Sequence, residues 1–201
     1  MKQKDLEIAL QKVPTFKDPA PSLEQYLTPT NIAADIIFTA YGFGDIENKI
    51  VVDLGCGTGI FSLGAYLCGA SNVVGVDIDR ECINQARGHI FENNININFV
   101  IDEVKNISIV CDTVIMNPPF GAQKSNQKAD RRFIEKGFEI SPVIYSLHLS
   151  KTIPFINKMV SSLGGKIDYS KDYVFPIKSM FKFHEKRVVN FDVTLLRILT
   201  K

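Results

Sequence analysis

The chain has 201 residues, of which 45% are hydrophobic and 22% are charged. This composition is typical of a one-domain globular protein and excludes a long disordered chain, a fibre or a small disulfide-dense domain. No apolar run approaches the roughly 20 residues that a membrane span requires. The start, MKQKDLEIAL, lacks the apolar core and cleavage site of a secretory signal, so we expect no membrane association.

The charge is unevenly distributed along the chain. Residues 1–150 hold 13 Lys and Arg against 18 Asp and Glu, whereas residues 151–201 hold 10 against 4, and the whole chain carries +1. A basic end suits an anionic partner, although a solvated lysine-rich surface would have the same composition. The four cysteines form no C-x-x-C pair. We therefore expect reduced thiols, no metal site, and a cytoplasmic location, with the nucleus open if the organism is eukaryotic.

The hydrophobic pattern predicts alternating strands and helices. Residues 13–22, with three prolines, are expected to form an extended arm, and Thr30 is expected to cap a helix that ends at Gly42. The predicted strands are 50–54, 72–77, 97–101, 113–116, 143–147, 166–173 and 189–199. The predicted helices between them are 60–68, one capped by Asp79, one near 130–139, and one from a Ser150 cap to Leu163.

This alternation predicts a single α/β domain over residues 1–201, with an N-terminal arm at 1–29 and a core at 30–201. The core should be a parallel sheet covered by helices on both faces. Ligands of such sheets bind at the carboxyl ends of the strands.

A glycine turn follows the first predicted strand. Gly55, Gly57 and Gly59 read G-x-G-x-G, and Ile60 stands where a dinucleotide-binding turn needs its last glycine. No Gly-Lys-Ser/Thr end of a P-loop is present, so a pyrophosphate ligand is disfavoured. Asp77 ends the second strand, where a carboxylate can accept hydrogen bonds from both ribose hydroxyls or serve only as a helix cap.

The segments VVDLGCGTG and VVGVDID resemble the class I S-adenosylmethionine-dependent methyltransferases. The resemblance implies a Rossmann-like, mostly parallel seven-stranded sheet with an antiparallel last strand. It also implies S-adenosylmethionine as cofactor. By this resemblance the methionine part is held by Asp53, Gly55, Gly57 and Thr58, the ribose by Asp77 with Ile78, and the adenine by Asp102, with Gln25, Tyr26 and Thr28 folding over the cofactor. Asp102 could equally be a surface turn residue.

The tetrapeptide Asn117-Pro118-Pro119-Phe120 follows the fourth predicted strand. Two prolines stiffen the chain and remove two amide donors, which leaves the Pro118 carbonyl free of ladder pairing. This carbonyl and the Asn117 side-chain oxygen can hold the two hydrogens of one NH2 group. The lone pair of an aromatic amine, normally delocalised, is then directed at a sulfonium methyl, while Phe120 stacks on the base. Outside such a site the motif would be only a rigid turn.

This motif resembles that of amino-methyltransferases acting on adenine, cytosine or glutamine. Members acting on glutamine usually have Tyr in the fourth place, so Phe120 favours a nucleobase. The resemblance extends over nearly the whole chain through four further segments: LEQY-x-T near the start, DTVIMNPPFG, IYSLH and the late FKFH. They are similar to the methyltransferase-like family of eukaryotes and archaea that makes N6-methyladenosine in small-subunit ribosomal RNA. Thr58 and Leu27 depart from some members without touching the proposed chemistry.

Two basic segments, 121–136 and 178–187, suit an RNA substrate, because cations track phosphates and rings stack on unpaired bases. The candidate RNA-binding residues are Lys124, Lys128, Arg131, Arg132, Lys182, Phe183, His184 and Lys186. Core packing is the alternative for Phe181 and Phe183, and a structural role is the alternative for His184 and His148.

The third predicted strand, INFVI at 97–101, would lie at the sheet edge in this fold. An apolar edge without Lys or Pro invites strand addition, and the family implies a small zinc-binding activator protein as the partner. Alternatively, the chain's own loop covers this edge.

Two rival functions stay open from the sequence. One is glutamine N5 methylation of a protein substrate. The other is a non-catalytic, S-adenosylmethionine-binding RNA assembly factor, against which the intact Asn-Pro-Pro-Phe speaks.

Overall fold

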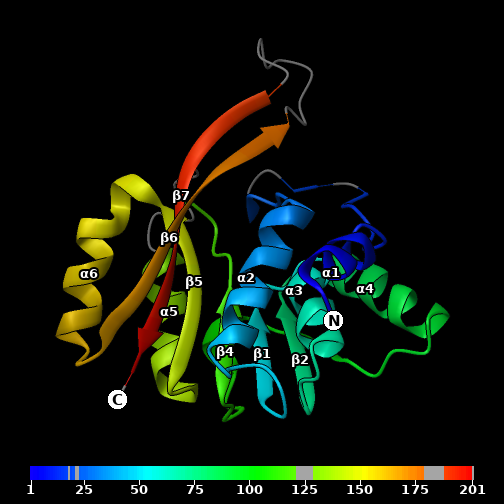
Figure 1. Ribbon diagram of the computed structural model, residues 1–201, viewed down its shortest axis with the longest axis horizontal. Helices are drawn as coiled ribbons and strands as arrows, with labels where there is room; N and C mark the ends of the chain where they lie inside the picture. Colours follow the sequence, from blue (N-terminus) through cyan, green and yellow to red (C-terminus); the bar gives the residue numbers. More distant parts are fainter. Residues whose placement is uncertain (18, 21–22, 121–128, 179–187, 201) are drawn as a thin grey trace.

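A computed structural model describes residues 1–17, 19–20, 23–120, 129–178 and 188–200 (Figure 1). The helices are α1 (Gln3–Leu10), α2 (Thr30–Gly42), α3 (Ile60–Leu67), α4 (Arg80–Glu92), α5 (Ala129–Ile140) and α6 (Ile153–Ser162), with short 3-10 turns η2 (Val104–Asn106) and η4 (Ser150–Thr152). The strands are β1 (Ile50–Leu54), β2 (Asn72–Asp77), β3 (Asn98–Ile101), β4 (Thr113–Met116), β5 (Val143–Leu149), β6 (Lys166–Lys178) and β7 (Val188–Leu199).

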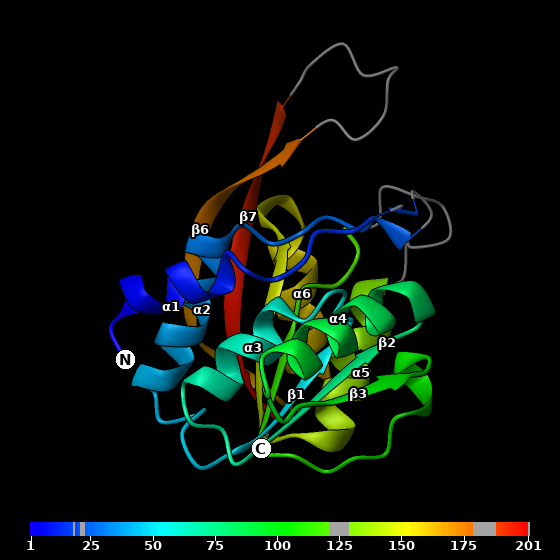
Figure 2. The same ribbon diagram turned by 90° about the vertical axis from the view of Figure 1, so that its right-hand side faces the viewer.

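The strands form one sheet in the order β3-β2-β1-β4-β5-β7-β6. The pairs from β3 to β5 are all parallel, and β7 runs antiparallel to both β5 and β6. The predicted seven-stranded, mostly parallel sheet with an antiparallel last strand is therefore confirmed. Strand β3 lies at the outer border of the sheet, beyond β2 (Figure 2).

Helices cover both faces of the sheet, as expected. Side chains alternate along each strand, so Val51 belongs to the core that contains the buried residues of α1 to α4, whereas Val52 and Leu54 belong to the core that contains those of α5 and α6. Because both faces are buried, the central strands are almost continuously apolar. Among the described residues, no helix is long and apolar enough to cross a bilayer.

Local capping signals were only partly right. Asp79 caps α4, since its Oδ1 accepts hydrogen bonds from the backbone N–H groups of Glu81 (2.8 Å) and Cys82 (3.4 Å). Thr30 instead begins α2, and Pro29 takes the cap position without a side-chain bond. Ser150 does not cap α6, because its hydroxyl pairs with Thr194 of β7 at 2.9 Å. The Ser150 prediction was wrong because a tertiary partner competes with the local backbone.

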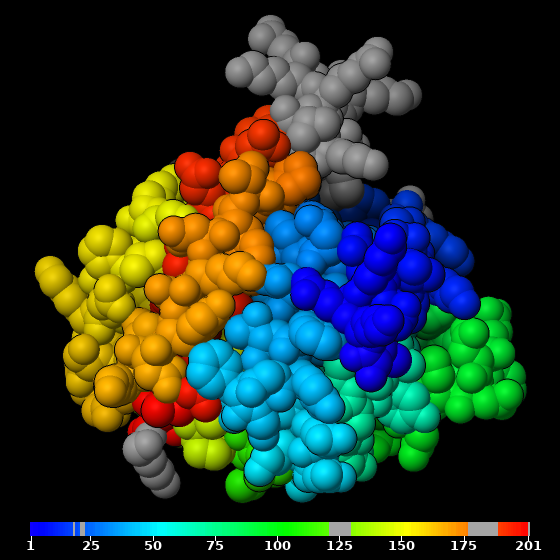
Figure 3. Space-filling view, in the orientation of Figure 1, coloured from blue at the N-terminus to red at the C-terminus, as the bar shows by residue number. Residues whose placement is uncertain are grey.

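Helix α1 was not among the elements expected from the sequence. Leu6 and Leu10 are fully buried in the core that α1 shares with α2 and α3. Asp35 of α2 accepts hydrogen bonds from Gln3 (3.0 Å), Lys171 (2.6 Å) and Tyr173 (2.6 Å), which joins α1 and α2 to β6. Figure 3 shows these segments side by side on one face of the molecule. Strand β6 is also longer than predicted and ends at Lys178.

The tightest packing around β2 gives a test of this fold. A Cβ on Gly75 would lie 2.5 Å from the Phe99 ring and 2.9 Å from the Ser62 hydroxyl. We expect Gly75→Ala to lower the free energy of unfolding by about 1–3 kcal/mol through overpacking. Gly88→Ala in α4, where nothing lies within 4 Å, is the matched control and should stabilise by about 0.5–1 kcal/mol. Urea unfolding measures both, and equal midpoints for the two variants would contradict the described packing.

Candidate active site

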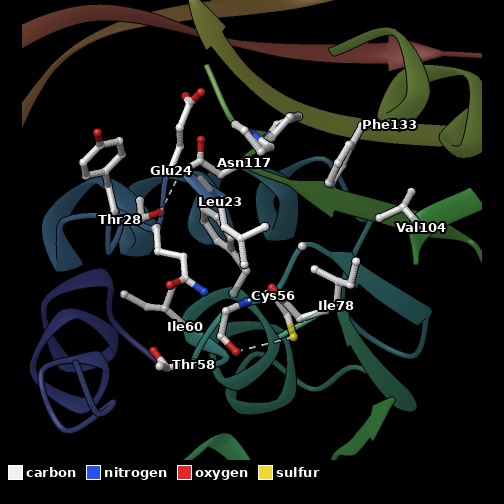
Figure 4. Close-up of a pocket in the computed structure, with 18 of the residues that line it drawn as sticks. Leu23, Glu24, Thr28, Cys56, Thr58, Ile60, Ile78, Val104, Asn117 and Phe133 are labelled. Carbon is white, nitrogen blue, oxygen red and sulfur yellow. Dashed lines mark hydrogen bonds between the residues drawn. The ribbon is translucent and has the colours of Figure 1, made fainter. Parts of the chain in front are cut away.

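A cavity opens where the carboxyl ends of β1, β2, β3 and β4 meet (Figure 4). Its walls come from these strand ends, from α5 and from the N-terminal arm. The lining includes Phe16, residues 23–28, Gly55, Cys56, Gly57, Thr58, Asp77, Ile78, residues 102–105, residues 117–120, Arg132 and Phe133. The glycine turn and the Asn-Pro-Pro-Phe motif therefore face one common space, as the sequence analysis requires.

The floor of the cavity is the glycine turn between β1 and α3. Gly55, Gly57 and Gly59 have φ values of 71°, 53° and 90°, which side chains rarely tolerate. Space restricts the turn as well, because a Cβ on Gly57 would lie 3.0 Å from the Phe16 ring. The turn thus presents bare backbone to a ligand.

Asp77 at the end of β2 holds this turn in place. Its Oδ2 accepts a hydrogen bond from the Gly57 N–H at 2.8 Å, and its Oδ1 accepts one from the Asp79 N–H at 2.9 Å. Burial raises the pKa of the Asp77 carboxyl above its ordinary value. Each oxygen keeps a further lone pair, so the carboxylate can brace the turn and still accept ribose hydroxyls.

Asp53 lies deeper than predicted and is not among the residues that line the cavity. Its Oδ2 accepts hydrogen bonds from the backbone N–H (2.9 Å) and the hydroxyl (2.7 Å) of Ser62, near the start of α3. Its Oδ1 is buried without a partner. Burial raises the pKa of this carboxyl to about 7, with a smaller contribution from Asp77. The geometry assigns Asp53 to positioning α3 behind the turn.

The arm forms part of the cavity wall and is held by hydrogen bonds of its side chains. Gln25 donates from its amide to Asp79 at 2.6 Å and accepts from the Ala20 N–H at 2.7 Å. Gln25 thus lines the cavity while its hydrogen bonds attach the arm to the start of α4. Tyr26 and Thr28 also line the cavity, and burial raises the pKa of the Tyr26 phenol.

Asn117 has one amide atom bound and the other free. Its Nδ2 donates to the Thr28 hydroxyl oxygen at 3.1 Å, whereas its Oδ1 is buried and has no partner (Figure 4). Among the described residues, no backbone N–H donates to the Pro118 carbonyl. Phe120 also lines the cavity and packs edge-on against Phe175, with ring centroids 5.9 Å apart. The motif therefore offers acceptors and an aromatic face.

The cavity wall that follows β2 and β3 combines a carboxyl group with an apolar side chain. Asp102 lines it, but its Oδ1 already accepts from the Glu103 N–H (2.7 Å) and the Asn106 amide (2.6 Å), so it also stabilises its own turn. Ile78 lines the same side and is 53% exposed. An apolar surface available beside a carboxylate suits an adenine ring with its amine.

These residues fit S-adenosylmethionine. The hydroxyl of Thr58 and the Oδ1 atoms of Asp53 and Asn117 are buried without partners, and buried polar atoms normally have one. A polar ligand in the cavity would satisfy those that reach it, and the carboxylates of Asp77 and Asp102 suit its positive charge. Within the described ranges, no three His, Cys, Asp or Glu side chains converge as metal ligands would.

The predicted RNA-binding residues are only partly described. Arg132 lines the cavity, and Arg131 is exposed on α5 and pairs with Glu135 at 2.7 Å. Lys124, Lys128, Lys182, Phe183, His184 and Lys186 lie outside the described residues, as does Phe181.

The structural alternative holds for His148. It is fully buried on β5, 2.7 Å from the Ser146 hydroxyl and 2.7 Å from Asp130 of α5. It thereby ties β5 to the start of α5.

Several lining residues were missed from the sequence. Glu103, Val104 and Lys105 follow the end of β3, so the rule about strand ends could have found them. Phe16 and Phe133 line the cavity because the arm and α5 pack beside it. The sequence around each of them contains no motif that predicts this.

The raised pKa of Asp53 generates a test. A carboxyl whose folded pKa is about 7, against an ordinary 3.8, contributes stability at low pH that is lost as pH rises through 7. Relative to the wild type, Asp53→Asn should therefore gain about 2–4 kcal/mol of stability between pH 4 and pH 8. Denaturant unfolding of both proteins at the two pH values checks this, and a pH-independent difference would contradict it.

Comparisons with known proteins agree with this site. Residues 39–140 match the family model described as Methyltransferase small domain. The chain is 38% identical to the rRNA N(6)-adenosine-methyltransferase METTL5 of Danio rerio and 34% identical to that of Drosophila melanogaster, in both cases over 98% of this chain and at least 96% of the relative. A solved structure of a candidate RNA methyltransferase from Pyrococcus horikoshii is 39% identical, has a TM-score of 0.91, and covers 99% of this chain and 98% of its own.

The match of the family model spans β1 to α5, which carry the glycine turn and the Asn-Pro-Pro-Phe motif, and the relatives align over nearly the full length. The chain belongs to the Methyltransferase small domain family and, within it, to the METTL5-like methyltransferases.

Proposed function

We propose that the protein transfers a methyl group from S-adenosylmethionine to the N6 amine of an adenosine in small-subunit ribosomal RNA. The names of the METTL5 relatives support ribosomal RNA and the N6 position. The observation that carries the proposal is that Asn117, whose Oδ1 has no hydrogen-bond partner, lines a cavity shared with the glycine turn.

The cofactor site follows from the residues around this cavity. Asp77 would hold the ribose, Asp102 and Ile78 the adenine, and the glycine turn with Thr58 the methionine part. The cofactor supplies an electrophilic methyl group on a sulfonium sulfur. Asp53 supports this site from behind through Ser62.

The chain contributes positioning rather than a strong base. Asn117 Oδ1 and the Pro118 carbonyl each accept one hydrogen of the adenine amine, so the nitrogen lone pair points toward the cofactor side of the cavity. Both oxygens also stabilise the positive charge that develops on the nitrogen. Orientation of this kind can supply about 7–11 kcal/mol of the barrier. The surplus proton passes to solvent.

Phe120 holds the base, and a stacking contact of this kind is worth about 1–3 kcal/mol. Its edge-on contact with Phe175 fixes the ring from the far side. The exposed cations of α5, with the lysine-rich segments predicted from the sequence, would contact RNA phosphates. A compact domain of this size suits an exposed loop better than a duplex, because flipping out a paired base costs a few kcal/mol. With a ribosomal substrate, we expect the protein in the cytoplasm or, in a eukaryote, the nucleus.

Labelled S-adenosylmethionine incubated with the protein and total RNA tests the function directly. We expect label in N6-methyladenosine of the small-subunit RNA. Label in a protein band would instead support the glutamine methyltransferase, which Phe120 disfavours.

Two variants separate catalysis from cofactor binding. Asn117→Ala should lower the transfer rate by at least about 100-fold, with little change in the cofactor Kd, because it removes one of the two acceptors. Asp77→Ala should mainly raise the cofactor Kd, by about 10-fold or more, because it removes both the brace of the turn and the ribose acceptor. Calorimetry and single-turnover kinetics measure the two effects. An Asn117→Ala protein that keeps its cellular effect would support the non-catalytic assembly factor.

We further propose a small zinc-binding activator protein as partner at β3. Among the described strands, β3 pairs with β2 alone, and it is mainly apolar. Phe91, in the last turn of α4, which packs against β3, is 84% exposed and enlarges the apolar surface. Arg87 donates to the Phe99 carbonyl at 2.6 Å, so an arriving strand would have to displace one side chain.

The partner proposal is tested by mixing the purified chain with the activator. We expect co-elution, higher solubility and a higher transfer rate. Phe91→Lys should weaken the complex by about 10-fold or more with little change in the stability of the isolated chain, because the ring contributes little to its own core and a cation is tolerated in the last turn of a helix. A chain that is monomeric, soluble and fully active alone at high concentration would overturn the proposal.

A further inference from the structure

We propose that Thr28 is a positioning residue that sets the orientation of the Asn117 amide. The inference rests on the proposed function, because it concerns which atom of Asn117 faces the substrate amine. It adds a catalytic consequence to an arm residue for which the sequence indicated only a cofactor contact.

The contact between the two side chains is specific. The Thr28 hydroxyl oxygen lies 3.1 Å from Asn117 Nδ2, and the two residues are 89 positions apart in the chain. Thr28 is only 3% exposed, so water does not readily replace this bond. In the described part of the chain, Asn117 Nδ2 has no other hydrogen-bond acceptor. A single hydroxyl therefore decides how this amide is held.

The orientation matters because the two ends of an amide have opposite hydrogen-bonding character. With Nδ2 bound to Thr28, Oδ1 remains as an acceptor, and it is buried without a partner. Rotation of the amide by half a turn would present two N–H donors to an amine whose hydrogens are also donors. Such a rotated side chain cannot hold the amine, so that fraction of the protein is inactive.

The hydroxyl keeps this polarity when its own proton is donated elsewhere. A threonine hydroxyl carries one proton and can accept at the same time. Thr28 lines the cavity, so its proton can be donated to an acceptor there while its oxygen accepts from Asn117. A hydroxyl that donates into the cavity no longer competes as a donor to Asn117 Oδ1.

The decisive variants are Thr28→Val, which keeps the shape and removes the hydroxyl, and Thr28→Ser, which keeps the hydroxyl. With saturating cofactor and RNA, the single-turnover methylation rate should fall by about 10- to 100-fold in Thr28→Val and stay within about threefold of wild type in Thr28→Ser. Thr113→Val is the matched control, because it removes a buried hydrogen bond (Thr113 hydroxyl to the Asp45 carbonyl, 2.6 Å) at the opposite end of β4. It should lower stability and leave the saturated rate unchanged.

A second readout does not depend on activity. In the ligand-free protein, the side-chain NH2 signal of Asn117, identified by its loss in Asn117→Ala, should exchange with water more slowly in wild type and Thr28→Ser than in Thr28→Val. Equal exchange in all three proteins would overturn the proposal.

The kinetic outcomes separate this inference from the proposed function. Wild-type protein that labels no adenosine refutes the function. Wild-type protein that labels adenosine, with a Thr28→Val variant that reaches the same saturated rate at a raised cofactor KM, refutes the positioning role and leaves Thr28 as a cofactor contact only.

Discussion

The site depends on the parallel pairing of β1 with both β2 and β4. In this register Leu54 lies opposite Val76 and Met116, so the glycine turn, Asp77 and Asn117 all follow their strands at the same edge. No additional loop is needed to bring the glycine turn, Asp77 and Asn117 to this edge of the sheet. The sheet itself places the Asp77 carboxyl group, a bare backbone turn and a stiff Asn-Pro-Pro turn around one cavity.

The polar groups around this cavity are arranged so that each support bond leaves an acceptor available. Asp77 braces the turn through two N–H donors and keeps lone pairs for a ligand. Asn117 is held by its nitrogen end alone, and behind the cavity Asp53 is held by Ser62 through one oxygen. Such unpaired acceptors destabilise a protein without ligand. Several unpaired acceptors near one cavity are typical of a binding site rather than of a well-packed loop.

The sheet could be predicted from the sequence because, along most of the core, the spacing of hydrophobic residues and the positions of turn-forming residues indicate the same strands and helices. Helix α1 was not predicted, because an isolated helix of eight residues is only marginally stable and this one depends on the burial of Leu6 and Leu10. The prediction that Ser150 caps a helix was wrong because the local sequence does not show that Thr194, distant in the chain, binds the Ser150 hydroxyl. At the site, the resemblance led to Gln25 and Thr28, but their partners Asp79 and Asn117 are distant in sequence. Only the folded chain shows these pairs.

The way the arm is attached has a consequence for the catalytic cycle. Between described residues, the backbone hydrogen bonds of positions 14–28 stay within the arm, and the side chains of Gln25 and Thr28 link it to Asp79 and Asn117 of the core. These two links end at the start of α4 and at the Asn-Pro-Pro-Phe motif. A displacement of the arm would therefore disturb the Asp77–Asp79 turn and the Asn117 amide together.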